Sequence, residues 1–448
     1  MSLVEFYVEV QLRQLRDNKV TNETPRIHIN EESDSIKMQL CGRGRKLWLL
    51  TFIATLTCVH FVLMYYDIRI LRWEPEVFLF GFGNTRTPNV SNATKKILFW
   101  NTMFGDETFY FGHGDIFNKC PNLPRDGCYA THSRRIFHIR DFDAILFHGN
   151  ELSVRDLPGE RDKSQRYIFV NLESPVTWIR RTKPFFEDYF NLTMTYRVDS
   201  DIQWPYYAVR DRKSGNIVAP AFNAVWKIPE DATDDVDKED QIMKIIKMKK
   251  RTAVWFVSNC DTDSAREKYV KELSKHVDVD VYGRCGSETK CPKGEDCFRK
   301  LVEPDYFFYL SFENSLCQDY VTEKLSNALK YHVVPVVYGG ANYNSSAPPN
   351  SFINTLDFRS PKQLAYFLIR LTKNPSEYAA YFKWKKYYDI VPSGQLTICN
   401  LCRYLHETTK NKIYDSMSDW YLKGKCPLQD KLSHYPYITK LATMFDND

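Results

Sequence analysis

Short apolar runs recur along the chain from about residue 95 onward, and polar or glycine-bearing residues follow each of them. The runs are KILFWN, DAILFHG, RYIFVNLES, TAVWFVSN, VDVDVYG, YFFYLSFEN and VVPVVYGG. Each has the length and composition of a buried strand. The segment SAREKYVKELSKH, between two of the runs, carries apolar residues at helical spacing. Alternating strands and helices predict parallel sheets, so we expect an α/β fold with two doubly wound domains that face a cleft.

The chain of 448 residues is longer than one hydrophobic core normally supports, and its composition suggests several segments. We expect two α/β domains at 95–235 and 251–390, in which ligands bind beyond the carboxyl ends of the strands. The other segments are a tail (1–46), an apolar span (47–66), a proline-bearing stem (67–94), a linker or insertion (236–250) and a C-terminal segment (391–448).

The apolar run Leu47–Tyr66 has no formal charge and, as a helix, matches the ~30 Å of a bilayer core. Basic residues at Arg43, Arg45 and Lys46 precede it. The run lies too far from the first Met for a cleaved signal peptide, so we expect a signal anchor rather than a buried core helix. The positive-inside rule then places residues 1–46 in the cytosol and the rest of the chain in the lumen.

The residues after this run fit an oxidising compartment in which proteins are glycosylated. They hold ten of the twelve cysteines, an even number that favours disulfides. The motif CNLC at 399–402 could serve a redox or zinc site, but no second CxxC pair or histidine cluster accompanies it. The predicted N-glycosylation sites are Asn89, Asn92, Asn191 and Asn344.

Charge gives no indication of a nucleic-acid partner. Lys and Arg total 61 against 56 acidic residues, so the net charge of +5 is small for a chain of this size. We therefore expect no DNA or RNA ligand.

The stretch FENSLCQDYVTEKLSNALKYHVVPVVYGG carries the strongest chemical signal. Its strand ends at Phe312, a polar turn follows, and a helix starts near Val321, so Glu323 and Lys324 stand in the first helical turn. Free N–H groups and a lysine at a helix start suit a diphosphate. The turn SNCDTDSAR places Arg266 in the same way after another strand. The alternative is a solvated first turn whose charges merely suit the helix dipole.

These motifs, with NLESP at 171–175, YRVDSDIQWPY at 196–206, YFKWKKYY at 381–388 and CNLC, resemble the α1,3/4-fucosyltransferase family. The resemblance covers about Lys95 to Cys402. It implies two Rossmann-like domains of the GT-B type, inversion at the fucose anomeric carbon, and GDP-fucose as the donor for a glycan on a glycoprotein or glycolipid. It also implies a Golgi membrane protein with a lumenal catalytic part and no obligatory metal cofactor.

The resemblance also implies roles for individual residues. Glu173 in NLESP corresponds to the general base, which takes the proton of the acceptor hydroxyl. The donor-binding candidates are Arg266 and Lys324 on the pyrophosphate, Glu323 on the ribose, and Asn314 and Tyr320 in the nucleotide pocket. The expected disulfides tie Cys120 and Cys128 to Cys399 and Cys402, with the register left open.

Three alternatives remain open at this stage. The DSD string at Asp199–Asp201 would suit Mn²⁺ in a metal-dependent transferase of another donor. A membrane-anchored lectin could keep the fold without catalysis. The acceptor is also open: His148 in FHGNEL is the acceptor-side candidate, but the family's His-His-Trp or His-His-Arg element is incomplete there. Both the innermost GlcNAc of N-glycans and lactosamine or LacdiNAc antennae are therefore candidates, with an α1,3 linkage favoured over α1,4.

Overall fold

The computed structural model of the chain describes residues 88, 90–124, 127–181, 186–227, 236–286, 296–408 and 412–427. All of them belong to one compact unit. Within these ranges no helix is both long and apolar enough to cross a bilayer. The proposed anchor at 47–66, the tail, most of the stem and Asn89 lie outside the described residues.

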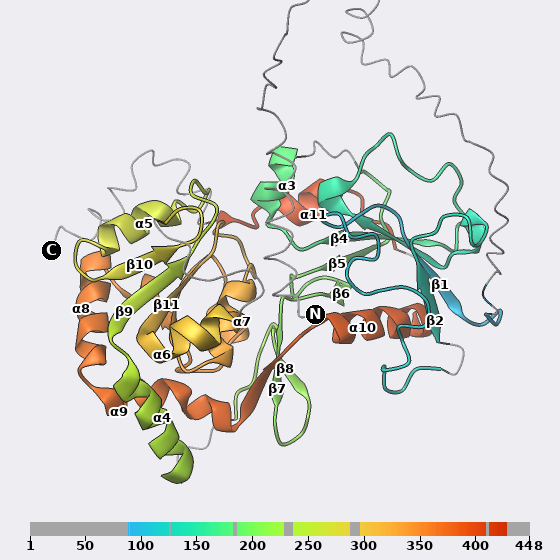
Figure 1. Ribbon diagram of the computed structural model, residues 1–448. Helices are drawn as coiled ribbons and strands as arrows, with labels where there is room; N and C mark the ends of the chain where they lie inside the picture. Colours follow the sequence, from blue (N-terminus) through green and yellow to red (C-terminus); the bar gives the residue numbers. More distant parts are fainter. Residues whose placement is uncertain are drawn as a thin grey trace, which may run out of the picture. The chain divides into compact units, whose positions relative to one another are not determined.

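Six parallel strands form the first sheet, in the order β2-β1-β3-β4-β5-β6. The strands are β1 Lys95–Phe99, β2 Cys128–Thr131, β3 Ala144–His148, β4 Arg166–Asn171, β5 Leu192–Thr195 and β6 Ile202–Gln203. Every residue of β3 and β4 is buried, as expected for strands covered on both faces. The helical segments of this half are η1 Ile139–Asp141, η2 Gly149–Glu151 and α3 Pro175–Arg181 (Figure 1).

Five parallel strands form the second sheet, in the order β10-β9-β11-β12-β13. Its strands are β9 Arg251–Phe256, β10 Val279–Tyr282, β11 Tyr306–Phe312, β12 Val334–Tyr338 and β13 Ile353–Asn354. Its helical segments are α4 Val236–Met248, α5 Arg266–Leu273, η3 Phe298–Val302, α6 Glu303–Asp305, α7 Glu323–Lys330, η4 Tyr343–Ser345, η5 Thr355–Asp357, α8 Pro361–Thr372, α9 Pro375–Ala379 and η6 Ala380–Lys386. Ile246 of α4 is buried in the core of this half, so α4 packs with the second sheet, although the sequence suggested a linker or insertion there.

Both sheets have the same strand order. The first strand in sequence lies between the second and the third, and the later strands continue outward. This is a doubly wound arrangement, and its ligands bind where the chain leaves the first and third strands in opposite directions. The α/β fold with parallel sheets is thus as predicted, and the rule points to the carboxyl ends of β9 and β11 in the second sheet.

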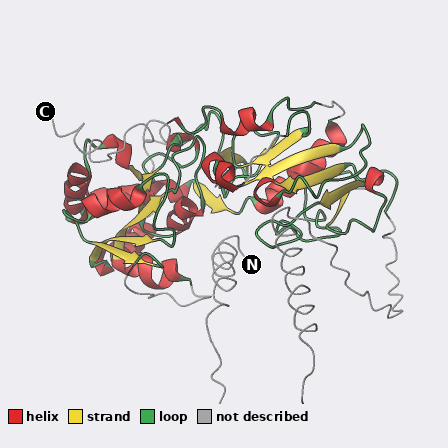
Figure 2. Ribbon diagram, turned by 90° about the horizontal axis from the view of Figure 1, so that it is seen from above, coloured by secondary structure: helices red, strands yellow, loops and turns green. Residues whose placement is uncertain are grey.

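A third, antiparallel sheet has the order β14-β7-β8. Its strands are β7 Ala208–Asp211, β8 Ile217–Ala219 and β14 Tyr388–Val391. After β14 the chain continues into α10 Gly394–Glu407, which contacts β1 and β6, and into α11 Met417–Leu422, which contacts α3. Figure 2 colours these helices and strands by type. The C-terminal segment therefore packs on the first sheet, far from it in sequence.

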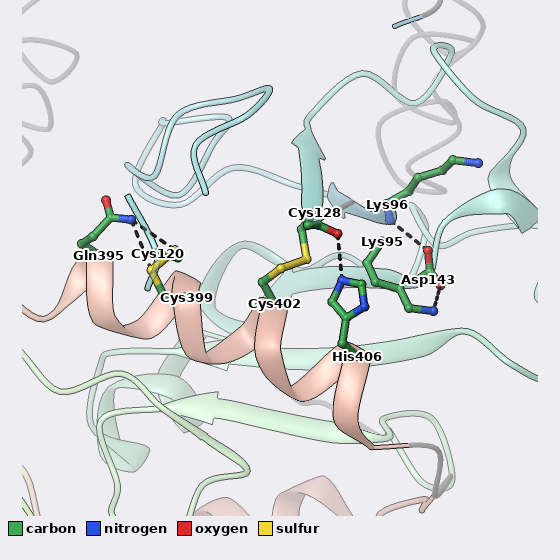
Figure 3. Close-up of a disulfide and its surroundings, with 10 residues drawn as sticks. Lys95, Lys96, Cys120, Cys128, Asp143, Gln395, Cys399, Cys402 and His406 are labelled. Carbon is green, nitrogen blue, oxygen red and sulfur yellow. Dashed lines mark hydrogen bonds and ion pairs between the residues drawn. A yellow bond between two sulfur atoms is a disulfide. The ribbon is translucent and has the colours of Figure 1, made fainter. Parts of the chain in front are cut away.

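Two disulfides fasten α10 to the first half (Figure 3). They join Cys120 to Cys399 and Cys128 to Cys402, which is the expected cluster and fixes its register. His406 lies beside the second disulfide, and its Nε2 is 2.8 Å from a backbone oxygen. Because both cysteines of this group are in a disulfide, they offer no thiolate to a metal.

Candidate active site

Helix α7 begins at the carboxyl end of β11. The β11–α7 loop (residues 313–322) ends at Thr322, whose backbone is extended. The Thr322 hydroxyl caps the helix by accepting a hydrogen bond from the Lys324 N–H. The helix thus starts at Glu323, two residues later than the sequence indicated. Glu323 and Lys324 stand in its first turn, as predicted.

Lys324 is held by three oxygen atoms. Its Nζ lies 2.8 Å from the Thr322 hydroxyl, 3.1 Å from Glu313 Oε2 and 3.4 Å from Glu323 Oε1. Burial alone would lower the pKa of Lys324, but the carboxylates of Glu313 and Glu323 outweigh it and raise that pKa above its ordinary value. The side chain is therefore a fixed positive charge, not a mobile surface lysine.

Glu313 is a site residue that the sequence analysis did not select. It is only 1% exposed, and its carboxylate accepts hydrogen bonds from the backbone N–H of Thr322 (2.8 Å), from the Thr322 hydroxyl (2.9 Å) and from Lys324. Burial raises its pKa. The available signal was a glutamate directly after the apolar strand YFFYLSF, where a buried carboxylate needs partners.

Arg266 approaches the same place from the start of α5. It is 4% exposed, and it donates to the backbone oxygens of Phe312 at 2.6 Å and Asn259 at 3.2 Å. Burial lowers the pKa of its guanidinium. The residue before it, Ala265, has a left-handed backbone with φ of 50°, which a side chain with a Cβ adopts only at a cost. Strain of this kind is concentrated at functional sites.

Three of the predicted donor-binding residues hold a buried polar atom that no described protein group satisfies. These atoms are Arg266 Nε, Asn314 Oδ1 and Glu323 Oε2. An unsatisfied buried donor or acceptor costs about 1–3 kcal/mol. A nucleoside diphosphate would offer acceptors to the guanidinium and hydroxyl and N–H donors to the two oxygens. The set therefore fits such a ligand.

The second glycine of VVPVVYGG explains how closely the β11–α7 loop is packed. A Cβ on Gly340 would lie 2.4 Å from the backbone carbon and oxygen of Leu316. A side chain at this position would displace the loop that carries Asn314 and Tyr320, so the motif needs glycine there.

Tyr320 connects this loop to the first half of the chain. Its buried ring lies 5.2 Å from that of Tyr196 and 6.4 Å from that of Tyr206, both edge-on. Burial raises the pKa of Tyr320 far above its ordinary value, and the Glu173 carboxylate acts in the same direction. Glu173, which follows β4, therefore lies within electrostatic reach of the β11–α7 loop.

The backbone of the β4–α3 loop (residues 172–174) is fixed from several sides. The Glu173 N–H donates to Asn171 Oδ1 at 3.1 Å, and the Tyr421 hydroxyl donates to the Glu173 carbonyl oxygen. The Oγ atoms of Ser174 and Ser315 are 2.8 Å apart and fully buried, which joins this loop to the β11–α7 loop. The loop of the predicted base and the loop before α7 are thus in direct contact.

Basic side chains pair with both carboxylates of the DSD string. Arg197 pairs with both oxygens of Asp199, at 2.8 Å for one of them, and Lys425 lies 3.6 Å away. Asp201 pairs with Lys412 and accepts from the Thr193 N–H at 2.9 Å. Because cations and N–H groups already satisfy these carboxylates, the metal-dependent alternative loses its ligands.

Two sequence expectations disagree with the structure. His148, the acceptor-side candidate, is 0% exposed beneath Phe104 and Phe109, and its Nδ1 lies 3.1 Å from the Thr102 oxygen. This ring packs against Phe104 and Phe109 in the interior, as a structural histidine does. Asn191 is 1% exposed, and its Nδ2 donates to Lys412 O at 2.8 Å.

The amide nitrogen of Asn191 is therefore engaged in the folded chain and is not a glycan attachment point, because a sequon is modified on the surface. The asparagines Asn92 and Asn344 are exposed, as glycosylation requires.

Comparison with known proteins identifies the family. Residues 92–207 match "Fucosyltransferase, N-terminal" and residues 246–420 match "Glycosyltransferase family 10 (fucosyltransferase) C-term". Alpha-(1,3)-fucosyltransferase C of Drosophila melanogaster is 35% identical over 354 residues, which cover 76% of this chain and 80% of the relative.

Two further matches are a mammalian relative and a solved structure. The human 3-galactosyl-N-acetylglucosaminide 4-alpha-L-fucosyltransferase FUT3 is 36% identical over 305 residues, or 66% of this chain and 75% of the relative. A solved α1,3-fucosyltransferase with GDP matches at 18% identity and a TM-score of 0.42, over 64% of this chain and 81% of that one, a likeness too remote to place site residues. The family matches and the sequence identities show that the chain belongs to glycosyltransferase family 10, the fucosyltransferases.

Proposed function

We propose that the chain transfers L-fucose from GDP-fucose to the O3 hydroxyl of a GlcNAc residue in a glycan, with inversion at the anomeric carbon. One observation carries the proposal: the loop that holds Glu173 meets the β11–α7 loop, which holds Asn314 and Tyr320 and leads into Glu323 and Lys324, through the buried Ser174–Ser315 hydrogen bond of 2.8 Å. A base and a diphosphate site on loops that contact each other are held at a fixed separation, so both can act on the bond between fucose and GDP.

Arg266 and Lys324 stabilise the leaving diphosphate in this proposal. Breaking the bond to fucose places negative charge on GDP, and fixed cations at the start of α5 and α7 meet that charge without reorganising. The free N–H groups at the start of α7 add to the effect. Glu323 accepts from the ribose hydroxyls, and Asn314 and Tyr320 line the nucleotide site.

Glu173 serves as the general base. In a single displacement the acceptor hydroxyl attacks the anomeric carbon while a carboxylate takes its proton, so the product has inverted configuration. Two hydrogen bonds fix the backbone from which this carboxylate extends. No step requires a metal, because two fixed cations already serve the diphosphate.

The acceptor belongs to the class that the relatives' names describe. The human relative acts on 3-galactosyl-N-acetylglucosaminide, and a bovine relative is a 4-galactosyl-N-acetylglucosaminide 3-alpha-L-fucosyltransferase. We extend the GlcNAc acceptor to this chain. An N-glycan core GlcNAc and lactosamine or LacdiNAc antennae all present that sugar.

The same proposal covers the architecture and the location. We infer that the two parallel sheets are the two halves of a GT-B transferase that face a cleft. We also infer that the run at 47–66 anchors the chain in the Golgi membrane, with the catalytic part in the lumen. The sequons and the disulfide-rich lumenal part support this location.

The test uses the full chain, purified in detergent, with GDP-fucose and separate core N-glycan, lactosamine and LacdiNAc acceptors. Mass spectrometry of the products maps the linkage. We expect α1,3-fucosylated GlcNAc from at least one acceptor, with activity retained in EDTA. Use of another nucleotide sugar with restoration by Mn²⁺ would support the metal-dependent alternative, and glycan binding without turnover of any donor would support the lectin.

A further inference from the structure

Residues 412–427, here called the C-terminal strap, follow α10 and pack against the first half of the chain. The Tyr414 N–H donates to the Phe190 oxygen at 2.9 Å, and the Met417 N–H donates to the Phe186 oxygen at 3.4 Å. The Tyr414 hydroxyl donates to Asp201 at 2.9 Å. The strap is thus bound along the segment that leads into β5, more than two hundred residues earlier in the chain.

The DSD string is the anchor of this strap. Asp201 pairs with Lys412 at its beginning, and Asp199 lies 3.6 Å from Lys425 near its end. Arg197, held by Asp199, donates to the Trp420 oxygen at 2.6 Å and stacks on the Trp420 ring at 4.0 Å. The carboxylates that resemble a metal motif therefore fix a piece of polypeptide.

The strap also reaches both loops of the candidate site. Its Tyr421 is buried against Trp178 at 5.4 Å and donates its hydroxyl to the Glu173 carbonyl oxygen. Its Cys426 forms a disulfide with Cys317, three residues before Tyr320 in the β11–α7 loop. One short segment thus contacts the base residue and is covalently joined to the loop of the donor ligands.

We propose that the C-terminal strap is a positioning element for fucosyl transfer: Tyr421 and the Cys317–Cys426 disulfide fix the β4–α3 loop, which carries Glu173, relative to the β11–α7 loop. The inference rests on the proposed function. The family match ends at residue 420, so Cys426 lies outside the matched segment.

Opening the disulfide should loosen this arrangement without unfolding the site. The β11–α7 loop keeps its Ser315–Ser174 contact at 2.8 Å, and the Gln318 N–H still donates to the Lys425 oxygen at 2.7 Å. The ligands of the diphosphate, on α5 and α7, are held by bonds within the second half. GDP binding should therefore survive, while the distance from Glu173 to the anomeric carbon becomes less well defined.

The test uses three variants. The first carries both Cys317→Ser and Cys426→Ser, the second carries Tyr421→Phe, and the third, a control, carries both Cys120→Ser and Cys399→Ser. The control removes a disulfide that touches neither loop, and Cys128–Cys402 still fastens α10. Calorimetry gives the GDP affinity and the number of binding-competent sites, and initial rates at saturating GDP-fucose and acceptor give kcat per competent site.

We expect kcat per competent site to fall by about tenfold to a hundredfold in the Cys317–Cys426 variant, since small misplacements of reacting groups cost that much. Tyr421→Phe keeps the ring packing and should lose about three- to tenfold, the effect of one hydrogen bond. GDP affinity should stay within about twofold. The Cys120–Cys399 control should keep the kcat of the unaltered chain.

An unchanged kcat per competent site in both strap variants would overturn the proposal and leave the strap a purely structural element. An equal fall in the control would do the same, because the effect would then follow from the loss of any disulfide. If the unaltered chain transfers no fucose but binds GDP, the proposed function fails instead, and the two failures are distinguishable.

Discussion

The substitution Glu313→Gln tests whether Lys324 owes its charge and position to a buried carboxylate. In the unaltered chain the Thr322 N–H donates to a Glu313 carboxylate oxygen at 2.8 Å, and glutamine keeps an oxygen that can accept this hydrogen bond. Its amide nitrogen, however, takes the place of the oxygen that lies 3.1 Å from Lys324 Nζ. Two donors then face each other, and Lys324 loses its buried negative partner.

The expected magnitude follows from this contact. A hydrogen bond to a charged group contributes about 1.5–3 kcal/mol, and the buried pair is poorly screened by solvent. A loss of about 2 kcal/mol in the transition state corresponds to a fall of about 30-fold in kcat/KM for GDP-fucose. We therefore expect a fall of at least tenfold.

The pH profile of transfer gives a second, independent signature. The carboxylates of Glu313 and Glu323 raise the pKa of Lys324 against the effect of burial. Without Glu313, burial is opposed by less negative charge, so the ammonium loses its proton at a lower pH. The alkaline limb of kcat/KM should accordingly move to lower pH in the variant.

The assay is kcat/KM for GDP-fucose across pH, beside the control Glu303→Gln. Glu303 is partly buried, whereas Glu313 is fully buried. The Glu303 carboxylate accepts from the His332 N–H and lies 2.8 Å from His332 Nδ1, but it precedes β11, at the other end of the strand. We expect the control to keep the original profile. A Glu313→Gln enzyme with unchanged kcat/KM and an unmoved alkaline limb would refute the reasoning.

Three further predictions follow from the same contacts. Transfer should survive EDTA, because the DSD carboxylates bind cations of the strap; a full loss that Mn²⁺ restores would contradict this. Replacing Cys128 and Cys402 by alanine leaves Cys120–Cys399 to join the same two segments, so it frees only a small ring and should lower the free energy of unfolding by about 2–3 kcal/mol, measured by denaturant titration; a change below about 1 kcal/mol would contradict it. Glycopeptide mapping should find glycans at Asn92 and Asn344 and none at Asn191, whose nitrogen is buried; an occupied Asn191 would show that this hydrogen bond does not form.

The strands were predictable because buried parallel strands carry continuous apolar runs. All seven runs read from the sequence overlap a strand of one of the two parallel sheets, such as Ala144–His148 in DAILFHG and Tyr306–Phe312 in YFFYLSFEN. Short strands were missed. Ile202–Gln203 and Ile353–Asn354 have only two residues each, too few for a periodic signal, and their pairing depends on neighbours elsewhere in the chain.

The positions of Arg266, Glu323 and Lys324 at helix starts were predictable, because each follows a strand and a polar turn in the sequence. The site was not predictable where the meaning of a residue depends on a distant partner. Glu313 acquires its role only when folding of the loop brings Lys324, eleven residues later in the chain, into contact with it. Asp201 acquires its role through Lys412, which no local pattern connects with it.

Glu173→Gln tests the central claim that one half of the chain supplies the base and the other half binds the donor. Calorimetry with GDP and initial rates at saturating acceptor should be measured on the same folded protein. We predict GDP affinity within about twofold of the original and a fall in transfer of about 10² to 10⁴, the range for a lost general base. Transfer that persists within about threefold would contradict the account, because the proton would then have another acceptor.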